Sequence, residues 1–208
     1  ITGHADLNIG TKKIAWLQSY TFSKFGDLRM GGNYLEKYPD FGRRTKYIQT
    51  KDGIDQVVVN PDERIQKFSG YKQWDILQKV LYKPSDKLTH SINFQLSNTS
   101  DIPRYDRLQD VKDFGGSIGR TLRYAEWYYG PQFRLLSAYR AQWIPSAHRE
   151  ISAQVYYQHI LESRFTREYL RYDRFDSRRE KIGVYGFNLD TRTKKGSDEF
   201  TYGIDGQW

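Results

Sequence analysis

The chain has 208 residues, enough for one substantial domain, and no cysteine, which excludes disulfides and thiolate metal sites. Its formal net charge is +8, but Lys and Arg are interleaved with Asp and Glu, which favours a dispersed charged surface over a nucleic-acid-binding patch. Aromatic residues make up 16% of the chain, and no segment reaches the roughly 18 consecutive apolar residues of a transmembrane helix.

Apolar and polar residues alternate along most of the chain, which is the two-residue period of a β-strand. The chain opens directly on such a segment without a signal peptide, so we expect a mature form or a fragment. The eight segments predicted to be strands are 3–10, 14–22, 66–82, 88–98, 125–143, 151–165, 180–190 and 200–208.

The segment 125–143 is far longer than the five or six residues of a typical soluble strand. Its odd-numbered positions, which include Trp127, Tyr129, Tyr139 and Trp143, are mostly apolar or aromatic. Its even-numbered positions are mostly polar or charged. The pattern therefore predicts one continuous strand with an apolar face and a polar face.

The connections between these strands alternate in length. The short ones, rich in turn-forming residues, are 10–13, 83–87, 144–148 and 193–199. The long ones are 31–65, 99–118 and 166–180. Short turns at one end and long loops at the other are typical of outer-membrane β-barrels. We therefore predict an all-β fold, an antiparallel transmembrane β-barrel with its apolar face toward lipid.

Aromatic residues on the apolar faces are predicted to form the girdles of such a barrel. Those close to the short turns, and so to the periplasmic interface, are Trp16, Tyr82, Tyr139 and Trp143. Those expected higher on the wall, toward the outer interface, are Trp74, Trp127 and Tyr129.

Five segments carry a resemblance to a known family: "FGDLRMG" (25–31), "SDIPRYDRLQD" (100–110), "RYAEWYYGPQFRLL" (123–136), "ESRFTREY" (162–169) and "FTYGIDGQ" (200–207). They resemble the barrel of TonB-dependent outer-membrane receptors, nearest to the haem, haemoglobin and siderophore branch, over nearly the entire chain. Such receptors have a plug domain and about 22 strands. The resemblance implies that this chain is one segment of the larger barrel.

The resemblance also implies function and partners. The protein would import a scarce nutrient, an iron–siderophore or haem, across the outer membrane of a Gram-negative bacterium. TonB and its inner-membrane energising proteins would act through the plug. The other expected partners are lipopolysaccharide and outer-membrane lipid, a small-molecule ligand or a carrier protein, and a surface lipoprotein. No catalytic motif is present, so we expect neither an enzyme nor a cofactor, and no nucleic-acid partner.

Aromatic and basic residues in the long loops are the candidates for substrate binding. They are Tyr34, Tyr38, Arg104, Tyr105, Arg107, Arg171, Tyr172 and Arg174. Guanidinium groups suit an anionic ligand such as a ferric siderophore or a haem propionate. The same arginines also suit lipopolysaccharide phosphates, or ion pairs that only order the loops. None of the four histidines falls in a predicted long loop, so no metal-ligating residue is expected here.

Two other functions fit the same pattern. Eight strands permit a complete small barrel with a channel, adhesin or structural role. A soluble, basic, aromatic-rich β-domain that binds nucleic acid or glycan is the third possibility.

Overall fold

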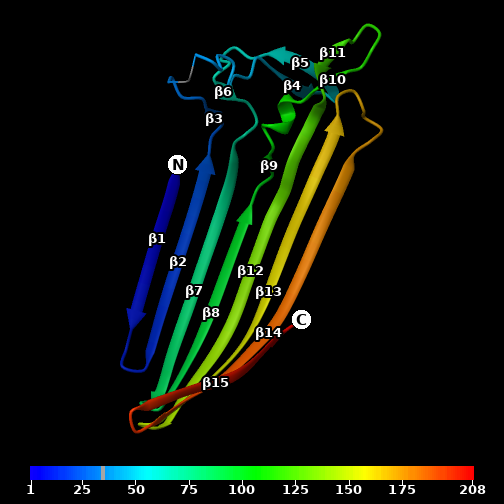
Figure 1. Ribbon diagram of the computed structural model, residues 1–208. Coiled ribbons are helices and arrows are strands. Elements are labelled where there is room, and N and C mark those ends of the chain that lie inside the picture. The colour runs from blue at the N-terminus through cyan, green and yellow to red at the C-terminus, as the bar shows by residue number, and fades with distance from the viewer. Residues whose placement is uncertain (34–35) are drawn as a thin grey trace.

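The computed structural model describes residues 1–33 and 36–208, and its main element is one curved antiparallel sheet (Figure 1). The long strands lie in the sheet in chain order: β1 (Thr2–Gly10), β2 (Ile14–Phe25), β7 (Tyr71–Ser85), β8 (Leu88–Thr99), β12 (Tyr124–Ser146), β13 (Arg149–Glu168), β14 (Asp176–Lys195) and β15 (Asp198–Gln207). Each of the eight predicted segments contains one of these strands, although the segment 66–82 becomes a strand of this sheet only at Tyr71, and the all-β, antiparallel part of the prediction is confirmed.

Small elements gather at one end of this sheet (Figure 1). Two short pairs come from the first long connection: β3 (Leu28–Arg29) with β6 (Ile65–Gln66), and β4 (Lys46–Lys51) with β5 (Ile54–Val59). The second connection contributes β9 (Ile102–Pro103), which pairs with β12, the single turn η1 (Arg107–Gln109), and the pair β10 (Val111–Asp113) and β11 (Arg120–Leu122). No helix in the described part of the chain is long and apolar enough to cross a membrane.

The turns at the opposite end are only two or three residues long. The predicted third long connection, 166–180, is wrong at both ends, because β13 continues to Glu168 and β14 begins at Asp176. Backbone pairing continues through this charged stretch, with Thr166 opposite Asp176. Charged residues suggested a loop, but backbone hydrogen bonds between strands do not require an apolar side-chain pattern, and the first residues of β14 are exposed on both faces.

The two faces of the sheet differ in chemistry. One face carries large apolar side chains that are left exposed, such as Trp16 at 42%, Val155 at 55% and Tyr185 at 49%. The other face is mostly polar. The only buried hydrophobic side chains among the described residues lie at the loop end: Ile48, Leu108, Leu122 and Trp127. The long strands therefore have no hydrophobic core of their own on either face.

The face of β12 changes part-way along the strand. Gly130 pairs with Ser163 and Phe133 with Leu161. Between these two pairs, two residues of β12 lie opposite a single residue of β13. Such a β-bulge reverses the inward and outward alternation beyond it. Trp127 and Tyr129 consequently lie on the polar face of the sheet, whereas Tyr139 and Trp143 lie on its apolar face.

The prediction that all seven girdle aromatics share one face is therefore wrong for Trp127 and Tyr129. It is right for the other five: the cross-strand register puts Trp16, Trp74, Tyr82, Tyr139 and Trp143 on the apolar face.

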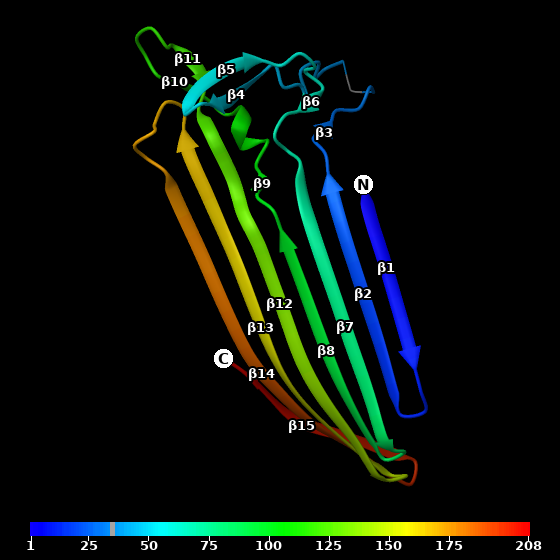
Figure 2. The same ribbon diagram turned by 180° about the vertical axis from the view of Figure 1, so that it is seen from behind.

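The sheet is open. β1 and β15 lie at its two edges, and no backbone pairing joins them in the described chain (Figure 2). Backbone pairing on the β15 side of β14 runs only from Tyr185 to Lys195, so the half of β14 nearer the loops has a strand neighbour on one side only. The sheet thus does not close into the small eight-stranded barrel.

Candidate ligand-binding cleft

The loop end is held together by a buried ion pair between β5 and β13. The guanidinium of Arg167 donates to both carboxylate oxygens of Asp55, at 2.7 and 2.8 Å. The side chain of Asp55 has no exposed surface, and that of Arg167 is 7% exposed. Arg167 also donates to Glu126 at 2.8 Å and to the hydroxyl of Thr50 at 3.1 Å. This cluster fixes the β4–β5 hairpin on the ends of β12 and β13.

The environment of Asp55 stabilises its charged form. Burial alone would raise the pKa of this carboxyl. Hydrogen bonds from Arg167, from the amide of Leu170 at 3.0 Å and from Thr50 at 2.8 Å outweigh that effect, so the pKa of Asp55 lies below its ordinary value. Its backbone amide in turn donates to the hydroxyl of Tyr172 at 2.9 Å. The hairpin is therefore tied to the connection between β13 and β14 as well.

A second buried arginine orders the first loop from within. Arg44 is 2% exposed and donates to the carbonyl oxygen of Lys67, while its own carbonyl oxygen accepts from the side-chain amide of Asn60 at 2.8 Å. Burial lowers the pKa of Arg44 to about 10. Because its contacts are to the backbone of its own loop, Arg44 holds that loop in shape and does not present its charge to a ligand.

The indole of Trp127 is the central support of the second connection. Arg104 lies 5.0 Å from this ring and donates to the hydroxyl of Tyr129 at 2.7 Å. Arg104 also forms a two-pronged ion pair with Asp106, at 2.8 and 2.7 Å. Arg164 lies 5.8 Å from the same indole. A buried aromatic ring with two guanidinium groups against it fixes the geometry of both arginines.

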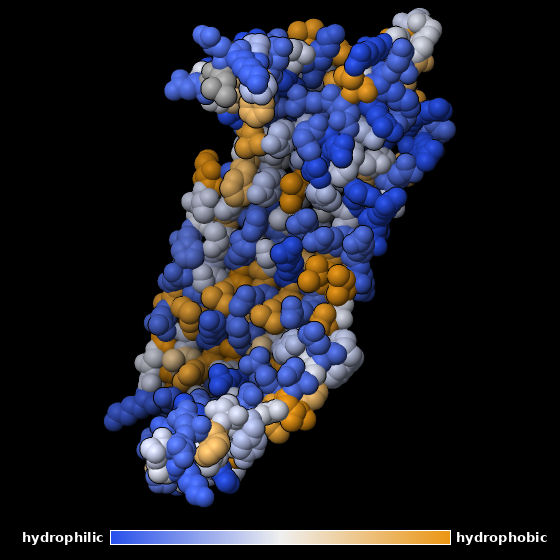
Figure 3. Space-filling view, viewed as in Figure 1, coloured by the Kyte–Doolittle hydropathy of each residue, from blue (hydrophilic) through white to orange (hydrophobic). Residues whose placement is uncertain are grey.

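Two adjoining cavities open beside this support. The first, of about 460 Å³, is lined by Arg107, Tyr124, Trp127, Arg164, Thr166, Arg174, Asp176, Ser177 and Arg178. The second, of about 480 Å³, shares four of these residues and adds Lys112, Arg123, Glu168, Arg171 and Asp173. We call the two together the arginine cleft. Hydrophilic residues dominate the loop end in the view of Figure 3.

Three of the predicted binding residues line this cleft: Arg107, Arg171 and Arg174. Arg104 and Tyr172 instead stabilise the loops. Arg104 donates hydrogen bonds to Asp106 and Tyr129, and the hydroxyl of Tyr172 accepts one from the backbone amide of Asp55. Tyr38 and Tyr105 are exposed and line neither cavity. Tyr34 lies outside the described residues.

The sequence prediction missed other residues of the cleft: Arg123, Tyr124, Trp127, Arg164 and Arg178. Arg164 and Arg178 are 14 positions apart in the sequence, and only the strand register shows that they face each other. A glycine and a proline in mid-strand, Gly130 and Pro131, were the available signal that Trp127 points the other way.

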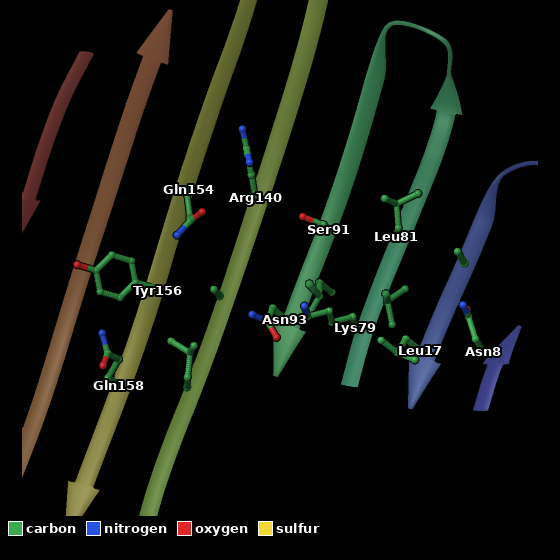
Figure 4. Close-up of a pocket in the computed structure, with 15 residues that line it drawn as sticks. Asn8, Leu17, Lys79, Leu81, Ser91, Asn93, Arg140, Gln154, Tyr156 and Gln158 are labelled. Atoms are coloured by element: carbon green, nitrogen blue, oxygen red, sulfur yellow. The ribbon is translucent and has the colours of Figure 1, made fainter. Parts of the chain in front are cut away.

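A third cavity, of about 600 Å³, lies against the middle of the polar face (Figure 4). Leu17, Leu81 and Leu136 line it together with polar side chains from five strands, including Lys79 and Arg140. The ring of Tyr156 extends from β13 toward β14, where a Cβ on Gly186 would come within 2.1 Å of it.

Comparison with protein-family models, with curated proteins and with solved structures found no match to this chain. The described residues include no group of three or more His, Cys, Asp or Glu side chains placed to hold a metal ion. The arginine cleft is the most developed candidate site, and guanidinium groups of the kind that line it can pair with carboxylate or phosphate groups.

Proposed function

We propose that this chain forms part of the wall of an outer-membrane TonB-dependent importer, with the arginine cleft on the extracellular side. The observation that carries the proposal is the exposed apolar face of the long strands. Water-exposed apolar patches larger than a few hundred Å² are rare in soluble proteins and signal an interface. This face spans eight strands and ends where the loop elements begin, so hydrocarbon is the partner that fits it best.

Hydrogen bonding on the apolar face supports a lipid environment. Gln18 and Gln78 are cross-strand partners in the middle of this face, and each is hydrogen-bonded within it. The indole of Trp16 donates to Gln78 at 2.9 Å, and Gln78 donates to the hydroxyl of Tyr20 at 3.0 Å. Tyr20 donates to Gln18 at 3.0 Å. Such mutual pairing lowers the cost of placing polar groups in hydrocarbon, where water cannot satisfy them.

The open edges and the polar face support a wall of more strands around a filled interior. Unpaired backbone groups cost several kcal/mol each in lipid, so both edges require further strands. The central cavity, with Leu17, Leu81 and Leu136 among polar side chains, offers the mixed surface that a folded plug would contact. A cationic cleft at the loop end fits capture of an anionic nutrient such as a ferric siderophore or haem.

Labelling of single cysteines on intact cells tests the arrangement. Cysteines at Lys51 and Asp173, in the loop elements, should react with an impermeant maleimide. Those at Ser146 and Ser197, in the short turns, should react only after the outer membrane is opened. Equal labelling of all four without opening would favour a soluble β-domain instead.

A further inference from the structure

We infer that the arginine cleft binds a small molecule with at least two neighbouring carboxylate or phosphate groups, held between Arg164 and Arg178. This inference rests on the proposed function in taking the loop end as the side of ligand capture, and it names the ligand class of that site.

Arg164 and Arg178 are direct cross-strand partners on the polar faces of β13 and β14. Like charges placed directly opposite each other destabilise a sheet. Neither guanidinium forms a salt bridge or hydrogen bond within the described chain, whereas nearby Arg134 and Arg167 both have carboxylate partners. A polyanion between the two guanidinium groups would turn this repulsion into attraction.

Two acidic residues lie next to the pair and line a further small cavity with it. Glu162 and Glu180 are the next cross-strand partners on the same face, but no salt bridge joins either to Arg164 or Arg178. Glu162 instead accepts from Arg134 at 3.2 Å. The first cavity of the cleft has a single carboxylate in its lining, Asp176, against the four guanidinium groups of its arginines.

The cleft is also organised in advance of binding. Trp127 is 8% exposed, and its ring lies under the guanidinium of Arg164. Glu168 accepts from Lys112 and Arg123, each at 2.7 Å, which fixes the neighbouring wall. A guanidinium group that is already ordered, as that of Arg164 is by Trp127, loses little freedom when it binds an anion.

Calorimetric titration of the full natural protein, purified in detergent, tests the inference. The probes are citrate and inorganic pyrophosphate, with acetate as the monoanion control. The test variant is Arg178→Gln. The control variant is Arg179→Gln, because Arg179 is adjacent in β14 but points to the other face, where it lies 5.7 Å from the ring of Phe165. Citrate and pyrophosphate distinguish carboxylate from phosphate ligands.

We expect at least one polyanion to bind and acetate not to bind. Arg178→Gln should weaken that binding about tenfold or more, since it removes charge-assisted hydrogen bonds, and Arg179→Gln should leave it unchanged. Without ligand, Arg178→Gln should melt at the same or a higher temperature than the unmodified protein, because a repulsion is removed.

Absence of polyanion binding, or an equal loss in both variants, would overturn the inference. So would a lower melting temperature of Arg178→Gln with binding unchanged. Cysteine labelling reports separately on the importer proposal: correct labelling without polyanion binding overturns the ligand class alone, and polyanion binding with labelling at every position overturns the importer alone.

Discussion

Asp55 and Arg167 are 112 residues apart in the chain and form a two-pronged ion pair buried beneath the loops. Removal of one partner from such a pair costs about 3–5 kcal/mol, because the other charge stays buried without compensation. Asp55→Ala should therefore release the β4–β5 hairpin from β12 and β13. Hydrogen exchange of residues 46–59 should rise strongly. Asp52→Asn, at the exposed turn of the same hairpin, should leave exchange unchanged.

The same ion pair predicts a pH dependence. The pKa of Asp55 is lower when folded than its unfolded value of 3.8, so its contribution to stability is present above that value. The contribution is lost as the pH falls through the lower, folded pKa. Hairpin exchange, corrected for its intrinsic pH dependence, should be constant from neutral pH to about pH 5 and rise only in stronger acid. A rise already near pH 6 would contradict the assignment to Asp55.

Leu135 and Leu136 are neighbours on β12 with opposite faces and so offer a matched test of lipid contact. Leu135 lies beside His159 on the apolar face, and Leu136 beside Gln158 on the polar face. Leu135→Arg should cost roughly 2–4 kcal/mol of folding free energy in lipid, if it lies near mid-membrane. Leu136→Arg should cost much less. Urea titration of folding in vesicles measures both, and equal costs would contradict the assigned faces.

Trp127 is expected to stabilise the loop elements and to contribute little to the stability of the long strands. Trp127→Ala removes a buried ring and the contacts of Arg104 and Arg164 with it, at a cost of about 3–5 kcal/mol. We expect faster proteolysis within 100–123 and weaker polyanion binding. Trp16→Ala, at an exposed position on the apolar face, should change neither. Limited proteolysis in detergent distinguishes the two variants.

The strands were predictable because their signal is local. Alternation along the chain located all eight long strands, and turn-forming residues located the four short turns. The face of Trp127 was not predictable from alternation, because one extra residue between Gly130 and Phe133 reverses it. The pairing of Asp55 with Arg167 and of Arg164 with Arg178 depends on which distant backbones come together, and no periodic pattern encodes that.

The strand order has a consequence for how the protein assembles. The long strands lie in the sheet in the order in which they follow one another in the chain. Each of the four short turns therefore closes a hairpin: β1 with β2, β7 with β8, β12 with β13, and β14 with β15. Joining these units requires closure of longer loops, whose entropy cost rises slowly with length. The longest connection, 26–70, separates β1 and β2 from everything that follows. We therefore expect the hairpin of β1 and β2 to join the sheet last. The ion pair of Asp55 with Arg167 should form first, because it ties the connection to β13 and leaves a shorter loop to close.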